Sequence, residues 1–83
     1  MSTPIVAEFS HNDCAAVIVE AIAKVWGPEA LAWSDKKTTR IAGTILGRII
    51  DRAEYVRLCS DGKHVIFRVV FPGGWDELTA GLK

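Results

Sequence analysis

The fold of this chain is decided by residues 35–71, which read DKKTTRIAGTILGRIIDRAEYVRLCSDGKHVIFRVVF. The first half of this stretch predicts a helix from about Asp35 or Thr38 to Arg52, because its apolar residues recur at helical spacing. Ser34 or Thr38 can cap the start of this helix. The residues that gather on its apolar face are Ile41, Ala42, Ile45, Leu46, Ile49 and Ile50.

The opposite face of this helix is basic and contains two glycines, Gly43 and Gly47. Glycine inside an exposed helix costs about 0.5–1 kcal/mol relative to alanine. Two of them on one face therefore indicate that something approaches the backbone closely. This can be a DNA backbone or a partner helix, or the C-terminal tail or Trp75 of the same chain. Four polar residues step along the exposed side at four-residue spacing: Arg40, Thr44, Arg48 and Arg52.

The second half of the stretch predicts a β-hairpin. Strand-forming residues at 55–60 and 63–71 flank Asp61-Gly62, a dipeptide typical of a two-residue type I′ turn. This turn fixes the register, so Leu58 should lie opposite Val65 and Val56 opposite Phe67. One apolar face of the hairpin should then consist of Val56, Leu58, Val65, Phe67 and Val69.

The flanking segments predict shorter elements. Pro72-Gly73-Gly74 should end the sheet, and Trp75 to Leu82 should form a tail of one helical turn with Trp75 docked on the body. Trp26 and Trp33 are expected to anchor the short helix between them. The N-terminal part predicts a strand at Ile5–Phe9, a helix at residues 12–26 and a short helix at Pro28–Trp33.

Length and composition indicate a single globular domain. The chain has 83 residues, of which 49% are hydrophobic and 24% charged. We expect one winged-helix-like domain over residues 1–83, with a core at 12–71 and a C-terminal tail at 72–83. The start of the sequence lacks a basic stretch followed by an apolar segment, so a cytoplasmic location is expected. Cys14 and Cys59 should remain thiols in that reducing compartment.

The formal net charge is zero, but the charges are unevenly spread. Residues 1–34 carry four acidic residues against the single base Lys24. Residues 35–70 carry eight basic residues against four acidic ones. The second half therefore presents either an ordinary solvated surface or a basic binding face.

The order of these elements resembles a winged helix-turn-helix domain, of the small type found in phage and mobile-element proteins. The resemblance is carried by residues 36–48 and by residues 60–67. It implies an α+β fold with three helices and a C-terminal β-hairpin wing. In that family a strand lies between the first two helices, and here only Ile5–Phe9 can replace it.

The resemblance also implies a binding site. The third helix would enter the major groove of DNA, and the hairpin would contact the DNA backbone. The candidate residues for contact with nucleic acid or a partner are Lys36, Lys37, Arg40, Gly43, Thr44, Gly47, Arg48 and Arg52 on the helix, and Lys63 and His64 at the wing tip.

Two function classes follow. The first is a small DNA-binding regulator whose partner is duplex DNA. The alternative is a phage-encoded inhibitor, similar to an anti-CRISPR protein, that binds a host nucleic-acid-processing complex through the same basic face. A homodimer is compatible with either class, and no membrane partner is expected.

Catalysis and metal binding have weaker support, and we expect no enzyme activity and no cofactor. The pairs His11/Cys14 and Cys59/His64 have spacing compatible with zinc ligands. However, Cys14 fits the buried stripe of the first helix, where a cysteine usually serves as a small apolar residue. Only His64 is placed beside Cys59, and a hairpin surface offers no pocket for a thiol nucleophile.

Overall fold

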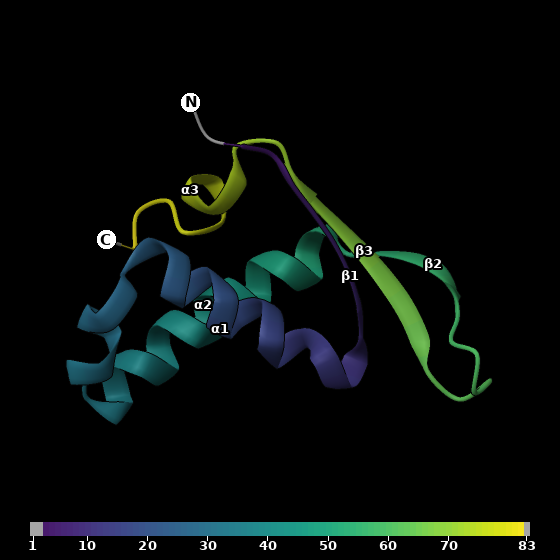
Figure 1. Ribbon diagram of the computed structural model, residues 1–83, viewed down its shortest axis with the longest axis horizontal. Coiled ribbons are helices and arrows are strands. Elements are labelled where there is room, and N and C mark those ends of the chain that lie inside the picture. Colours follow the sequence, from purple (N-terminus) through teal and green to yellow (C-terminus); the bar gives the residue numbers. More distant parts are fainter. Residues whose placement is uncertain (1–2, 83) are drawn as a thin grey trace.

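The computed structural model describes residues 3–82, except for the side chain of His11. Helices α1 and α2 cross each other on one side of a small sheet, and α3 packs near one end of it (Figure 1). Two 3₁₀ helices, η1 and η2, complete the described part. The elements in chain order are β1 (Ile5–Ser10), η1 (His11–Asp13), α1 (Cys14–Val25), η2 (Gly27–Ala32), α2 (Asp35–Arg52), β2 (Glu54–Leu58), β3 (Val65–Phe71) and α3 (Gly74–Leu78).

The sheet has three antiparallel strands in the order β1-β3-β2. Strand β1 pairs with β3 along its whole length, from Ile5 opposite Phe71 to Ser10 opposite Ile66. Residues opposite each other share a face of the sheet. Phe9 and Phe67 therefore face the helices together, whereas Glu8 and Arg68 lie on the uncovered outer face.

The α+β class agrees with the sequence, but the expected three-helix winged helix-turn-helix fold is wrong. Strand β1 precedes the first helix instead of following it, and the segment between α1 and α2 is a 3₁₀ helix. The hairpin is not a C-terminal wing, because β3 is the central strand of the sheet and α3 follows it. The cause lies in β1, whose alternating residues Ile5, Ala7 and Phe9 match the apolar face of β3.

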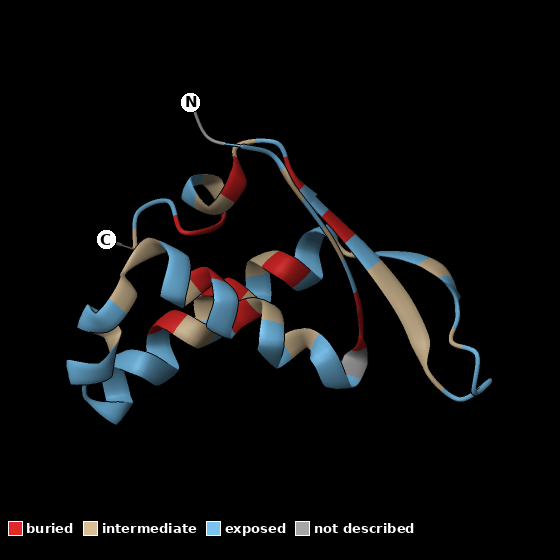
Figure 2. Cartoon of the chain, in the orientation of Figure 1, coloured by how far each residue is buried: buried red, intermediate tan, exposed pale blue. Residues whose placement is uncertain are grey.

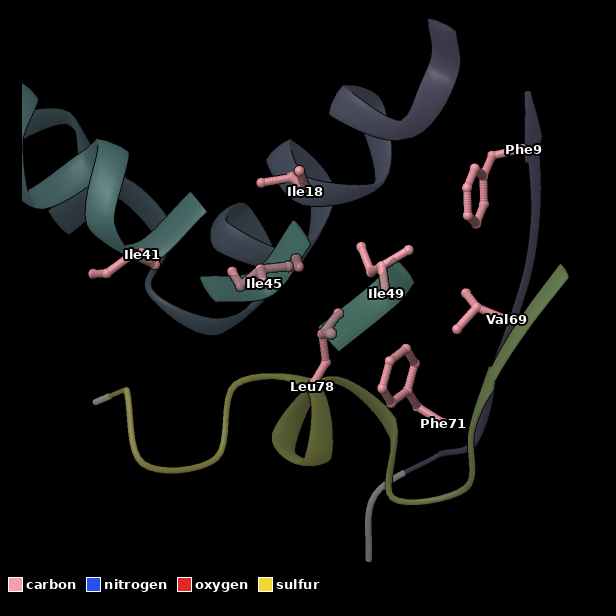
Figure 3. Packing of buried hydrophobic residues seen from close by; sticks show 9 residues of the cluster. Phe9, Ile18, Ile41, Ile45, Ile49, Val69, Phe71 and Leu78 are labelled. Atoms are coloured by element: carbon pink, nitrogen blue, oxygen red, sulfur yellow. The ribbon is translucent and has the colours of Figure 1, made fainter. Parts of the chain in front are cut away.

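The hydrophobic core lies between the helices and the inner face of the sheet (Figure 3). Ile45 and Ile49 of α2 are completely buried, as the helical periodicity predicts. The core extends beyond the expected range of 12–71, because Phe9 and Leu78 also belong to it. The complete buried apolar set is Phe9, Ile18, Ala21, Ile41, Ile45, Ile49, Val69, Phe71 and Leu78.

Helix α2 starts and ends close to the predicted positions. The hydroxyl of Ser34 accepts a hydrogen bond from the backbone N–H of Lys37, so Ser34 caps the helix as expected. Before it, the rings of Trp26 and Trp33 contact each other edge to face, with centroids 5.1 Å apart. The ammonium group of Lys37 lies 5.0 Å from the centre of the Trp33 ring. These contacts fix η2 against the start of α2.

The hairpin register is correct at its tip and shifts towards its base. Leu58 lies opposite Val65 as predicted, but Tyr55 takes the position opposite Phe67 that was expected for Val56. A β-bulge between Tyr55 and Arg57 inserts Val56 as an extra residue and moves Tyr55 to the helix-facing side. Sequence alternation alone does not reveal such an insertion.

The turn lies at Asp61-Gly62 but is not of type I′. Only Gly62 has a positive φ, of 68°, whereas type I′ requires it at both central residues. The backbone N–H of Gly62 donates to the carbonyl of Cys59, and the Asp61 carboxylate accepts from the N–H of Lys63 at 2.8 Å. The Asp61 side chain therefore organises a longer loop while the predicted register near the tip is kept.

Candidate interaction surface

The predicted site residues do not form one basic face. Lys36, Lys37 and Arg40 are exposed at the start of α2. Lys63 and His64 lie at the tip of the hairpin. Figure 1 shows these two places at opposite ends of the longest dimension of the molecule, which measures 39 Å. A single contact between helix and wing, as the winged-helix resemblance implies, is therefore not assembled.

Two further predicted residues, Arg48 and Arg52, hold α3 against α2. The Arg48 guanidinium donates to the carbonyl of Leu78 at 2.9 Å. Arg52 forms an ion pair with Glu77 and stacks 4.8 Å from the centre of the Phe71 ring. A hydrogen bond from the backbone N–H of Gly73, together with Arg52, lowers the pKa of Glu77. Both arginines therefore have structural roles within the chain.

At the hairpin tip, His64 connects the loop to η1. Its Nδ1 lies 2.7 Å from the carboxylate of Asp61, and its Nε2 lies 3.2 Å from the side-chain nitrogen of Asn12. Hydrogen bonds from the backbone N–H of Lys63 and from His64 lower the pKa of Asp61. His64 therefore fixes the loop, and Lys63 remains exposed beside it.

The uneven distribution of charge along the sequence is partly explained by the sheet. Glu8 of β1 receives hydrogen bonds from Arg57 at 2.7 Å and from Arg68 at 3.1 Å, across all three strands. These two contacts lower the pKa of Glu8. The acidic N-terminal segment therefore neutralises part of the basic second half.

The exposed side of α2 is uncovered at its two glycines. A Cβ atom added at Gly43 or Gly47 would meet nothing within 4 Å. Of the alternatives that the sequence left open, the one in which the tail or Trp75 packs over these glycines is therefore wrong. Thr44, between them, is half-buried, and its hydroxyl donates to the carbonyl of Arg40 at 2.9 Å. We call the exposed residues of this side the α2 surface: Lys36, Arg40, Gly43, Gly47, Ile50 and Asp51.

An apolar groove adjoins the α2 surface. It has a volume of about 480 Å³ between the helices and the inner face of the sheet. Burial raises the pKa of the Cys14 thiol, which therefore contributes to the lining in its neutral form. The lining residues are Phe9, Cys14, Ala15, Ile18, Leu46, Ile50, Ala53 and Phe67.

Ile50 belongs to both the groove and the α2 surface. The sequence assigned it to the buried face of the helix, but its side chain is 62% exposed. Because α1 and α2 cross, their ends diverge and α1 does not cover this part of α2 (Figure 1). Tyr55 and Leu58 extend the exposed apolar surface onto β2, with 64% and 55% of their surface accessible. Figure 2 shows most of β2 and the hairpin loop as exposed.

The two helix glycines should each lower the stability of the isolated chain. Gly43→Ala and Gly47→Ala should raise the free energy of unfolding by about 0.5–1 kcal/mol each, because alanine favours the helix and the space is open. Urea denaturation followed by circular dichroism measures this change. Gly62→Ala is the matched control and should destabilise, since Gly62 has a φ of 68°. Destabilisation by both helix substitutions would show that the glycines serve the fold itself.

Comparisons of the chain with protein-family profiles, curated proteins and solved structures found no match. Within residues 3–82, no helix has the length and apolar character needed to cross a membrane. Among the described side chains, no three His, Cys, Asp or Glu residues gather as ligands for a metal ion. The proposed zinc ligand His11 has a side chain outside the described part.

Proposed function

We propose that this chain is a protein-binding module, which seats a partner protein on the α2 surface and in the adjoining apolar groove. The observation that carries the proposal is Ile50, exposed where an open apolar groove meets a helix face with two glycines. Exposed apolar surface next to polar residues is typical of protein interaction sites. We also propose that the protein is located in the cytoplasm.

The positions of the charges support a protein partner over duplex DNA. DNA affinity grows with the number of phosphates that one face of a protein neutralises. Here Arg48 and Arg52 bind α3, and the loop between β2 and β3, which carries Lys63, lies far from the start of α2 (Figure 1). An inhibitor of a nucleic-acid-processing complex remains one form of this proposal, in which Lys36 and Arg40 meet an acidic patch of that complex.

Duplex DNA is the second candidate, favoured by the cluster of exposed cations at the start of α2. Lys36, Lys37 and Arg40 can together contact three phosphates. Their release of counterions would give a log–log salt dependence with a slope of about −2.7, at about 0.9 per phosphate. A titration against random duplex at two salt concentrations therefore separates the two candidates.

The proposal is tested by site-specific photocrosslinking in the cells that carry the gene. A photoreactive amino acid at Ile50 should give a discrete product with one partner protein. The same amino acid at Leu31, which is 91% exposed on η2, is the matched control and should give none. Ile50→Asp should abolish co-purification of that partner, because it places a charge at an apolar contact.

Identical products from positions 50 and 31, or a partner retained by Ile50→Asp, would contradict the proposal. Duplex binding with the slope given above, weakened and lowered in slope by about 0.9 in Lys37→Ala or Arg40→Ala but unaffected by Ile50→Asp, would favour DNA instead.

A further inference from the structure

We infer that the partner seated on the α2 surface is a second copy of this chain, bound through an antiparallel pair of α2 helices. This inference rests on the proposed role of the α2 surface and names its occupant. Three properties of that surface support the inference: the two glycines at its centre, the pattern of charge along the helix, and the exposed Ile50.

The centre of the surface allows two helices to approach closely. Gly43 and Gly47 are one helical turn apart on the side opposite the buried Ile45. A two-fold axis that runs between the two helices, perpendicular to them and level with the point midway between these glycines, sets Gly43 of one copy against Gly47 of the other. With no side chain on either residue, the backbones can make close van der Waals and Cα–H···O contacts.

The charges along the α2 surface are complementary to those of a second α2 helix that runs in the opposite direction. The N-terminal half of α2 exposes Lys36 and Arg40, and its C-terminal end exposes Asp51, followed by Glu54 of β2. An antiparallel pair brings the basic half of one copy against the acidic end of the other. A parallel pair would set like charges opposite each other, which is unfavourable.

The helical repeat also places these charges on matching sides. Arg40 and Asp51 are separated by about three turns, so they lie on the same side of the line through the two glycines. The two-fold axis reverses the direction of the helix but leaves these residues on the same side of the interface. Arg40 therefore meets Asp51 of the second copy. By the same repeat, Ile50 meets the methyl group of Thr39 on the other side. Among residues 3–82, neither Arg40 nor Asp51 takes part in an ion pair within the chain.

The contact is isologous and therefore closes as a dimer without leaving an open end. One pair of helix faces is a small interface, of the size found in weak or transient complexes. We therefore expect a dissociation constant in the range of about 1–100 μM. The fraction of dimer should then change over protein concentrations that are easily reached. Zero net charge at neutral pH favours such association.

The test is sedimentation equilibrium of the full chain from about 5 μM to 1 mM. The wild type should pass from monomer to dimer over this range. Gly47→Leu should raise the dissociation constant by about tenfold or more, because its side chain separates the helices. Ala16→Leu adds a similar side chain at an exposed position of α1 and should leave the constant unchanged. Circular dichroism establishes that each variant is folded.

A charge exchange tests the antiparallel arrangement itself. Arg40→Asp and Asp51→Arg should each weaken the dimer by about tenfold, because each creates like charges across the two-fold axis. The double variant restores opposite charges and should recover most of the wild-type affinity. In an equimolar mixture of the two single variants, both contacts of the mixed dimer join opposite charges, so the mixture should associate more tightly than either variant alone.

The outcomes separate this inference from the proposed function. A wild type that stays monomeric at 1 mM overturns the dimer, and so does a dimer that is unaffected by Gly47→Leu or not rescued by the double exchange. If the chain is monomeric but Ile50 still crosslinks to another protein, the surface binds a different partner and the proposed function stands. If the dimer forms as described and no other protein crosslinks, its partner is the second copy alone.

Discussion

Ile45→Ala should lower the free energy of unfolding by about 2–5 kcal/mol. Ile45 is completely buried at the middle of α2, where the helices meet. Its truncation removes apolar contacts and leaves a cavity that the tightly packed neighbours cannot fill. So small a domain has a total stability of only several kcal/mol, and the variant should be largely unfolded at 37 °C. Urea or thermal denaturation measures the loss.

Ile50→Ala is the matched control, with the same chemical change one and a half turns along the same helix. Ile50 is 62% exposed, so its truncation should change stability by less than about 1 kcal/mol. Equal losses for the two variants would contradict the assignment of buried and exposed sides of α2, and with it the α2 surface.

Leu78→Ala should be nearly as damaging, at about 2–5 kcal/mol. Leu78 lies in α3, in a segment that the sequence predicts to be a tail, yet only 1% of its surface is exposed. Its side chain points into the core beside Phe71 and Ile49 (Figure 3). Its carbonyl also accepts the hydrogen bond from Arg48. The loss should therefore include loosening of α3 from α2, visible as faster amide hydrogen exchange in residues 74–79.

Leu31→Ala controls for the removal of a leucine side chain as such. Leu31 is 91% exposed in η2, and its truncation should be nearly neutral. If Leu78→Ala were equally neutral, residues 74–82 would be a loosely attached tail, and Arg48 and Arg52 would be available for a binding partner.

The features that could be predicted from the sequence are local ones. The bounds of α2, its Ser34 cap and the burial of Ile45 depend on neighbouring residues and on helical spacing. The pairing of Leu58 with Val65 likewise follows from a nearby turn. In each case the signal lies within a few residues of the element that it determines.

The features that the sequence did not reveal depend on distant parts of the chain. The pairing of β1 with β3 decides the topology, and no local pattern reports which strand an isolated apolar segment joins. The exposure of Ile50 follows from the angle at which α1 crosses α2. Such tertiary geometry overrides the helical periodicity, which predicts that Ile50 is buried.

The same limit applied to the candidate site. Nothing in the sequence tells which of its seven Lys, Arg and His side chains are free and which already have a partner within the fold. Arg40 is exposed, whereas Arg48 and Arg52 are engaged by α3, although all three share one helical spacing. The partners of Arg48 and Arg52 lie 30 and 25 residues further along the chain, at the Leu78 carbonyl and at Glu77, so no local pattern pairs them.

The order of strands affects when the nascent chain can fold during synthesis. Strand β1 leaves the ribosome before α1 and α2, but β3, the strand with which it pairs, leaves after both helices. Until residues 65–71 emerge, Phe9 and the apolar sides of α1 and α2 have no sheet to close over them. These segments should thus remain open to chaperones and proteases until β3 has emerged, and then close in one cooperative step.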